Sequence, residues 1–282
     1  MRYIKKYIYL VPIVILLMLA VGFFVFRGDG MLVVTFLDVD QGDSILIQSP
    51  SSATVLIDCG PDRSVLSELG RSVPFYDRTI DLLVITHPDA DHITGCIDVV
   101  ERYRISRVLI TGIASTSNLW SILDDAIERK HIPATVARAG ESFMFDRAVL
   151  RVLFPLEDVS GQTFKNTNDS SIVAMLEYGD ERFLFTGDAN VSVEQKLLQV
   201  GTNVSAQVLK VGHHGSRTSS SREFLEKVHP AYAVIQVGEK NKYGHPTQDV
   251  LERLRHIGAK VLRTDRDGRL EMKSDGRQVR VK

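Results

Sequence analysis

The sequence predicts an α/β protein in which two mixed β-sheets pack face to face and helices cover their outer faces. Three observations lead to this fold class. Short β-branched runs open the domain, strand and helix patterns alternate from Ile80 onward, and 44% of the 282 residues are hydrophobic. We therefore expect a single four-layer αββα domain over residues 31–282, preceded by a separate segment over residues 1–30.

The separate N-terminal segment has the composition of a membrane anchor. Arg2, Lys5 and Lys6 precede residues 8–26, an uncharged apolar stretch close to the ~20 residues that a helix needs to cross a bilayer. The basic residues on its N-terminal side place the N-terminus in the cytoplasm and the rest of the chain outside. We expect a single-pass transmembrane helix with an extracellular domain; a cleaved signal peptide is the alternative.

Each element of the domain follows from its local pattern. Strands are expected where β-branched or continuous apolar runs end at polar or glycine residues: residues 32–39, 44–49, 54–60, 80–86, 106–111, 134–139, 148–155, 171–179, 182–188, 206–212, 232–238 and 260–265. Helices are expected where apolar residues recur with helical spacing: residues 93–103, 118–131, 191–199, 221–228 and 247–258. The basic tail, residues 263–282, is expected to form a solvated edge hairpin.

Four ionisable residues follow one of these strands in "LVITHPDADHITG", residues 83–95: His87, Asp89, Asp91 and His92. Unpaired charge near a core is costly, so a metal site explains the crowding better than a structural role. In extended chain, residues two apart share a side, so His87 and Asp89 are expected to address one cation and Asp91 and His92 a second. Asp188, in "FLFTGD", is expected to bridge them, at the ~3.5–4 Å separation typical of two-metal sites, where a hydroxide is the nucleophile.

Further polar residues stand just beyond other strands. Asp58 in "VLIDCG" is expected to lie behind the ligands and orient a histidine. Two adjacent histidines, His213 and His214, follow a strand in "KVGHHGS", and His245 lies in the loop "YGHP". Strand ends meet at one edge of a sandwich, so these groups are expected to share a single cleft.

The order of these motifs resembles the metallo-β-lactamase superfamily, whose usual signature is H-x-H-x-D-H. Within it, the chain resembles the C-terminal extracellular hydrolase domain of ComEC-type competence DNA-uptake proteins. The motifs that carry this resemblance are "DVDQGDS" (residues 38–44), "LIDCG", "HPDADH", "NTNDSS", "TGD", "HHGS" and "NKYGHP" (residues 241–246). The resemblance covers nearly the whole chain outside the predicted anchor.

The resemblance implies roles for individual residues. The metal ligands would be His87, Asp89, Asp91, His92, Asp188 and His214. The catalytic residues would be His213 and Asp91, with His245 at the leaving group. The residues expected to support the ligands or contact substrate are Asp58, Asn168, Ser171, Lys210 and Ser216, although a lysine on a strand usually faces solvent.

The sequence departs from the general pattern at two positions. Asp89 replaces the usual second histidine, and "NTNDSS" stands where the third motif normally supplies a histidine. One of the two divalent cations would therefore have oxygen-rich ligands, which favours Mn²⁺ or Mg²⁺ relative to a histidine-rich zinc site. The two cysteines, Cys59 and Cys96, are expected to be buried residues beside the site and not a disulfide, although extracellular exposure would permit a bridge.

The expected function is metal-dependent hydrolysis at the outer face of the cell membrane, by a phosphodiesterase or nuclease acting on DNA. By the resemblance, the polymer would be single-stranded DNA in competence, although participation in DNA uptake is an analogy. Alternatives are a phosphorylcholine esterase, lactonase or β-lactamase of the same fold, or a binding module without turnover. The net charge of −1 provides no global attraction for nucleic acid or anionic membrane, and no nucleotide cofactor is expected.

Overall fold

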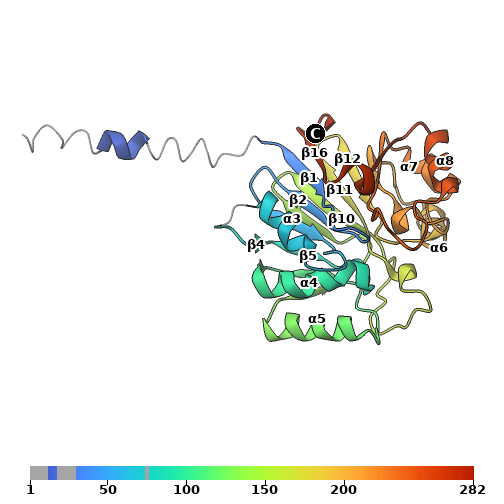
Figure 1. The fold of residues 1–282 in the computed structure, drawn as a ribbon, viewed down its shortest axis with the longest axis horizontal. Coiled ribbons are helices and arrows are strands. Elements are labelled where there is room, and N and C mark those ends of the chain that lie inside the picture. Colours follow the sequence, from blue (N-terminus) through green and yellow to red (C-terminus); the bar gives the residue numbers. More distant parts are fainter. Residues whose placement is uncertain (1–11, 18–29, 74–75) are drawn as a thin grey trace, which may run out of the picture.

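Two large β-sheets form the centre of the computed structural model, which describes residues 12–17, 30–73 and 76–282 (Figure 1). The first sheet has eight strands in the order β17-β16-β1-β2-β3-β5-β7-β8. Its strands are β1 (Leu32–Phe36), β2 (Ile45–Gln48), β3 (Thr54–Ile57), β5 (Leu82–Val84), β7 (Val108–Ile110), β8 (Ala134–Val136), β16 (Leu270–Ser274) and β17 (Val279–Val281).

The second sheet has seven strands in the order β15-β14-β13-β12-β11-β10-β9. Its strands are β9 (Ser142–Phe145), β10 (Ala148–Phe154), β11 (Val173–Tyr178), β12 (Glu181–Phe185), β13 (Val208–Lys210), β14 (Tyr232–Ile235) and β15 (Lys260–Arg263). Strands β4 (Thr79–Ile80) and β6 (Arg104–Ile105) pair separately in a small two-stranded sheet.

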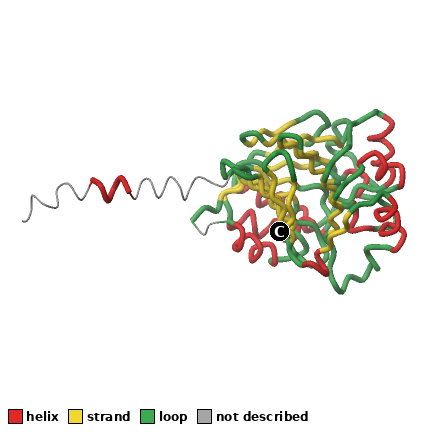
Figure 2. The backbone as a smooth tube through the Cα atoms, turned by 90° about the horizontal axis from the view of Figure 1, so that it is seen from above, coloured by secondary structure: helices red, strands yellow, loops and turns green. Residues whose placement is uncertain are grey.

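Helices lie on the outer face of each sheet (Figure 2). The first sheet is covered by α3 (Ser64–Ser72), α4 (Ala90–Arg102) and α5 (Asn118–Arg129). The second is covered by α6 (Val191–Gln199), α7 (Arg222–Val228) and α8 (Gln248–His256). Shorter helical segments are η1 (Thr167–Ser170), η2 (Gly212–Gly215) and α9 (Thr264–Asp267).

Three separate hydrophobic cores hold these layers together. Ile45 and Ile47 of β2 point into the core between the sheets, whereas Leu46 points toward α3, α4 and α5. On the second sheet, Val208 of β13 faces the central core and Leu209 faces the helices on the other side. This alternation is the two-residue period of a strand buried on both faces. The predicted αββα architecture is confirmed.

The structure describes the N-terminal stretch of the chain only in part and the C-terminal stretch completely. Within the described residues, no helix is both long and apolar enough to cross a membrane. The predicted anchor over residues 8–26 falls mostly outside those residues, which include only the helical residues 12–17 of it. At the other end, β16 and β17 form a hairpin as expected, but only β17 is an edge strand. Strand β16 pairs with β1 and buries alternate residues, which corrects the expectation of a solvated hairpin.

The core between the sheets predicts a large stability loss for Phe183→Ala. Phe183 lies on β12 and is fully buried in this core. Truncation would remove apolar contacts and leave a cavity, so the free energy of unfolding should fall by about 3–5 kcal/mol. Chemical denaturation measures this change. Met144→Ala, at a side chain that is 76% exposed, is the matched control and should change stability by less than about 0.5 kcal/mol; equal effects would contradict the assigned core.

Candidate metal centre and active site

Four parallel strands bring the polar groups of the site to one edge of the sandwich. Strands β3 and β5 are parallel neighbours in the first sheet, and β12 and β13 are parallel neighbours in the second. Asp58 and His87 follow the first pair of strands, and Asp188 and His214 follow the second. Because the sheets face each other, their carboxyl ends surround one space, as the sequence predicts.

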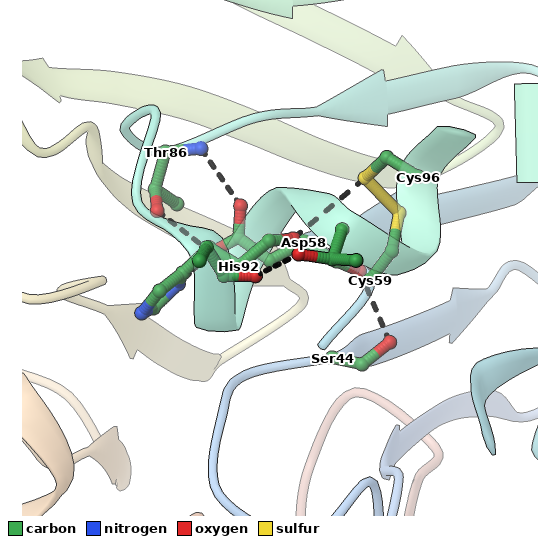
Figure 3. Close-up of a disulfide and its surroundings, with 8 residues drawn as sticks. Ser44, Asp58, Cys59, Thr86, His92 and Cys96 are labelled. Atoms are coloured by element: carbon green, nitrogen blue, oxygen red, sulfur yellow. Dashed lines mark hydrogen bonds and ion pairs between the residues drawn. A yellow bond between two sulfur atoms is a disulfide. The ribbon is translucent and has the colours of Figure 1, made fainter. Parts of the chain in front are cut away.

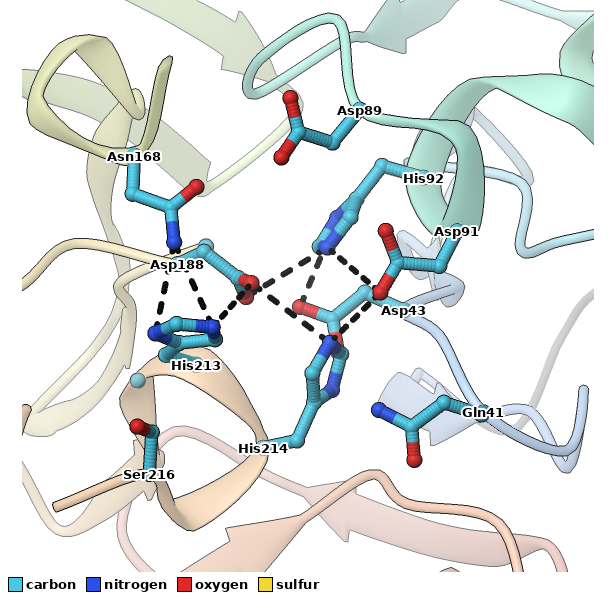
Figure 4. A network of polar contacts seen from close by, with 12 residues as sticks. Gln41, Asp43, Asp89, Asp91, His92, Asn168, Asp188, His213, His214 and Ser216 are labelled. Carbon is cyan, nitrogen blue, oxygen red and sulfur yellow. Dashed lines mark hydrogen bonds and ion pairs between the residues drawn. The ribbon is translucent and has the colours of Figure 1, made fainter. Parts of the chain in front are cut away.

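Four residues in this space form a cluster, here called the metal tetrad: Asp91, His92, Asp188 and His214 (Figure 4). One nitrogen or oxygen of each lies within 4.8 Å of those of the others. His92 Nε2 is 3.4 Å from Asp188 Oδ1, and His214 Nε2 is 3.2 Å from Asp91 Oδ2. Asp91 and His92 both belong to the first turn of α4.

The tetrad residues fit a divalent cation. His92 Nε2 and Asp188 Oδ1 are buried and have no hydrogen-bond partner in the part of the chain that the structure describes. Unpaired buried polar atoms are costly, and a divalent cation coordinated by both of these atoms would satisfy them. Two imidazole nitrogens and two carboxylate oxygens are a donor set suited to Zn²⁺ or Mn²⁺.

His87 and Asp89 lie beside the tetrad and not within it. His87 Nε2 is also buried without a hydrogen-bond partner among the described residues, and it is 3.7 Å from Asp89 Oδ2. Asp89 accepts a 2.5 Å hydrogen bond from the Thr167 hydroxyl, a contact that the sequence did not indicate. The structure thus gathers four of the six predicted ligands and leaves these two as an incomplete second position.

Asp58 fixes the orientation of His92. Its Oδ2 accepts a 2.8 Å hydrogen bond from His92 Nδ1, and its two oxygens accept from the backbone N–H and the hydroxyl of Thr86 at 2.8 and 2.6 Å. A carboxylate on Nδ1 selects the tautomer that leaves Nε2 free to bind a cation. The contact is the one expected for Asp58, while Thr86 was not identified from the sequence.

The expectation that Cys59 and Cys96 do not pair is wrong, because the structure joins them in a disulfide (Figure 3). Cys59 follows Asp58 directly, and Cys96 lies one turn after His92 on α4. The bridge therefore connects the two segments that carry the Asp58–His92 contact. The 37-residue separation concealed this proximity, which Gly95 permits: a Cβ there would lie 2.1 Å from the Cys59 carbonyl oxygen.

Lys210 is fully buried, which corrects the expectation that a strand lysine faces solvent. Its ammonium forms an ion pair with Asp43, donates to the Gly187 carbonyl at 3.1 Å and lies 3.8 Å from Asp188 Oδ1. Strand β13 is central in its sheet, so both of its faces are covered. The lysine therefore points into the site and compensates buried carboxylates.

Asp43 is the functional residue that sequence reasoning missed. Its Oδ1 lies 3.3 Å from His214 Nδ1, which also donates a 2.9 Å hydrogen bond to the Gln236 carbonyl. The signal was present, since Asp43 belongs to "DVDQGDS", but that motif gave no indication of a partner. Had the burial of Lys210 on β13 been predicted, its charge would have called for a buried carboxylate nearby.

The remaining predicted residues surround the tetrad at different distances. His213 Nε2 is 3.8 Å from Asp188 Oδ2, and Asn168 donates toward the His213 ring at 3.3 Å. The Ser171 hydroxyl accepts a 3.2 Å hydrogen bond from the Asp188 backbone N–H. Ser216 bonds to Thr218 and not to the tetrad.

His245 reaches the site through His213, with 5.6 Å between the two ring centroids. Burial and the neighbouring His213 lower the pKa of His245 to about 4, and burial also lowers the pKa of His213. Both rings are therefore neutral near pH 7, each with one donor and one acceptor nitrogen. This state favours accepting a proton or a hydrogen bond over delivering a proton from an imidazolium.

In the tetrad, the pKa values of the histidines are raised, in contrast to those of His213 and His245. Burial lowers the pKa of His214, but the carboxylates of Asp188 and Asp43 outweigh it and raise that pKa to about 10. The pKa of His92 is likewise raised by Asp188 and Asp58 against the effect of burial. The histidines hold the pKa of Asp91 and of Asp188 well below the usual range despite burial. Without a cation, protons on the two imidazoles balance the carboxylates.

Comparison with known proteins agrees with this architecture. The sequence model of the metallo-beta-lactamase superfamily matches residues 37–239. The chain is 32% identical to ComE operon protein 3 of Bacillus subtilis over 86% of this chain and 33% of that protein. It is 32% identical to competence protein ComA of Neisseria gonorrhoeae over 90% of this chain and 34% of that protein. The chain thus spans about a third of the length of these relatives.

Solved structures share the fold at low sequence identity. The diiron β-hydroxylase CmlA of Streptomyces venezuelae superposes with a TM-score of 0.57 and 16% identity, over 86% of this chain and 54% of that one. The metallo-beta-lactamase fold protein YhfI of Bacillus subtilis gives 0.52 and 12%, over 83% and 96%.

The Lys210–Asp43 pair predicts that Lys210→Met destabilises the protein. Removing the ammonium would leave Asp43 buried without its cation, which costs about 3–5 kcal/mol of unfolding free energy. The double variant Lys210→Met/Asp43→Asn should recover part of the loss, and Lys227→Met, at an exposed lysine of α7, should change little. Chemical denaturation of all three tests this, and a stable Lys210→Met single variant would contradict the pairing.

The raised histidine pKa values predict that cation binding releases protons. Below about pH 10 the imidazole of His214 is protonated in the cation-free site, and a cation must displace that proton. Apparent affinity for Mn²⁺ should therefore rise with pH between about 6 and 8. Calorimetric titration in two buffers of different ionisation enthalpy measures the protons released. A His214→Ala variant should release fewer, and affinity independent of pH would contradict the assignment.

Proposed function

We propose that this chain, which belongs to the metallo-beta-lactamase superfamily, is a metal-dependent hydrolase of phosphodiesters and acts on DNA. The observation that carries the proposal is the metal tetrad, a largely buried set of two carboxylates and two imidazoles, in which His92 Nε2 and Asp188 Oδ1 have no hydrogen-bond partner among the described residues. A divalent cation would satisfy these atoms, and the position of the set matches the site edge of an α/β sandwich.

The substrate part of the proposal draws on the named relatives. One is named competence protein ComA and another ComE operon protein 3, and each is about three times as long as the matched segment. If this chain also serves competence, we expect its substrate to be DNA. We propose that the predicted anchor over residues 8–26 holds the domain, residues 31–282, at the outer face of the membrane.

The metal part of the proposal is two divalent cations, Zn²⁺ or Mn²⁺. The tetrad would hold one, and His87 with Asp89 would contribute to the second. Bound there, a divalent cation supplies Lewis acidity to a phosphoryl oxygen and lowers the pKa of a water. The oxygen donors at the second position favour Mn²⁺ there.

The chain's own residues orient and transfer protons around that chemistry. Asp58 holds the His92 ring, and Asp43 with the Gln236 carbonyl holds the His214 ring. The neutral His213, beside Asp188 and Asn168, is placed to accept a proton at a ring nitrogen. The neutral His245 lies behind it and is placed to hydrogen-bond a leaving oxygen.

A substrate panel tests the proposal. The full chain, purified in detergent, should cleave single-stranded DNA and bis-p-nitrophenyl phosphate with Mn²⁺, and EDTA should abolish both activities. Asp188→Asn should reduce kcat by about 10²-fold or more, because the tetrad loses a charged donor. Lys227→Ala, on α7, is the matched control.

Other outcomes of the panel would redirect the assignment. Turnover of nitrocefin alone would contradict the phosphodiester proposal. Cleavage of the small diester without DNA would remove the nuclease part. A protein that binds no Mn²⁺ or Zn²⁺ and hydrolyses no ester would contradict the proposal altogether.

A further inference from the structure

A cleft opens beside the metal tetrad and has no role in the chemistry described above. Its volume is about 360 Å³, near the lower end of the ~300–1,000 Å³ typical of small-ligand sites. Residues 240–243 form one wall of the cleft, and Asp40, Gln41, Pro61, Ala90 and Asp91 of the tetrad complete its lining. A ligand that fills the cleft would therefore lie beside Asp91, a residue of the metal tetrad.

The wall formed by residues 240–243 presents an exposed aromatic ring. Tyr243 is 67% exposed and lies nearly parallel to the His245 ring, at an interplanar angle of 20° and 5.9 Å between centroids. Asn241 holds the loop, because it donates to the carbonyls of Gly238 and His245 and accepts from the Tyr243 backbone N–H. The ring is thus presented by an ordered loop, which lowers the entropic cost of binding.

The same wall carries positive charge. Lys240 and Lys242 line the cleft on either side of Asn241, and both are exposed. Asp40 and Asp91 are the two acidic residues that line the cleft. With a cation bound to the tetrad, the charge of Asp91 would be offset, so the cleft would present two ammonium groups against one free carboxylate.

Gln41 connects the first motif of the domain to the loop that lines the cleft. Its Oε1 accepts a 3.2 Å hydrogen bond from the Gly238 N–H, which ties it to the loop. Its Nε2 is shielded from solvent and has no hydrogen-bond partner in the described part of the chain. Gln41 therefore ties the lining of the cleft to the loop that carries Tyr243, and its buried Nε2 is not exposed to a ligand in the cleft.

We propose that this cleft binds the nucleotide next to the scissile phosphate of a single-stranded nucleic acid, with its base stacked on Tyr243 and its outer phosphate at Lys240 and Lys242. The proposal rests on the proposed phosphodiesterase function and specifies its substrate. A base can stack on a side chain only after it leaves its neighbours, which a single strand allows and a duplex resists. The cleft also has the volume of a small ligand and not of a duplex.

Binding measured in EDTA tests the cleft without requiring turnover. Fluorescence anisotropy of a labelled oligothymidylate with the full chain in detergent gives Kd for the parent and the variants. Tyr243→Ala should raise Kd about 10-fold through lost stacking, and Tyr243→Phe, which keeps the ring, should restore parental binding. Lys240→Ala/Lys242→Ala should reduce the slope of log K against log salt by about 0.7, the value for one phosphate contact on a single strand, whereas Lys227→Ala should leave it unchanged.

Turnover separates failure of the cleft from failure of the proposed function. With Mn²⁺, Tyr243→Ala should raise KM for the oligonucleotide and lower the ratio of its kcat/KM to that for methyl p-nitrophenyl phosphate about 10-fold. The parent should prefer a single strand over the same sequence as a duplex. Parental Kd and salt slope in all cleft variants, or a preference for duplex, would overturn the proposal. Loss of oligonucleotide binding in Tyr243→Ala, in a parent that hydrolyses nothing, would support the cleft and contradict the hydrolase.

Discussion

The structure depends on the compensation of negative charge that is buried at one edge of two sheets. Asp43, Asp58 and Asp188 are almost inaccessible, and Asp91 is largely covered. Buried carboxylates are tolerated only with counter-charge and hydrogen bonds. Lys210 supplies one fixed positive charge. The imidazoles of His92 and His214 supply more, either as protonated rings or as ligands of a cation, so cation binding and folding are linked at this edge.

The scaffold keeps these groups in register through contacts outside the site. The three cores fix the sheets and helices, and the parallel strands deliver their carboxyl ends to one place. The Cys59–Cys96 disulfide then joins the segment that carries Asp58 to the helix that carries His92. Gly95 allows that helix to approach the Cys59 carbonyl closely enough for the bridge. A small displacement of α4 would therefore move two members of the tetrad at once.

The cleft and the tetrad share Asp91, so a ligand in the cleft would lie next to the candidate metal centre. Chemistry at the tetrad requires only a phosphoryl group, so it does not by itself select a polymer. The exposed Tyr243 and the two lysines are groups that distinguish a nucleotide from a simple ester. Selectivity would thus reside in a loop whose sequence is independent of the metal ligands.

The sequence by itself determined the αββα architecture and the crowded residues His87 to His92, because strand periodicity and unpaired charge leave clear local patterns. It also indicated Asp188, His214 and Asp58, since each follows an apolar strand. Only the tertiary structure decided that Lys210 is buried against Asp43, that Cys59 pairs with Cys96, and that His87 and Asp89 stand apart from the tetrad. These are contacts between segments far apart in the chain, and local sequence patterns carry no information on which distant side chain lies opposite.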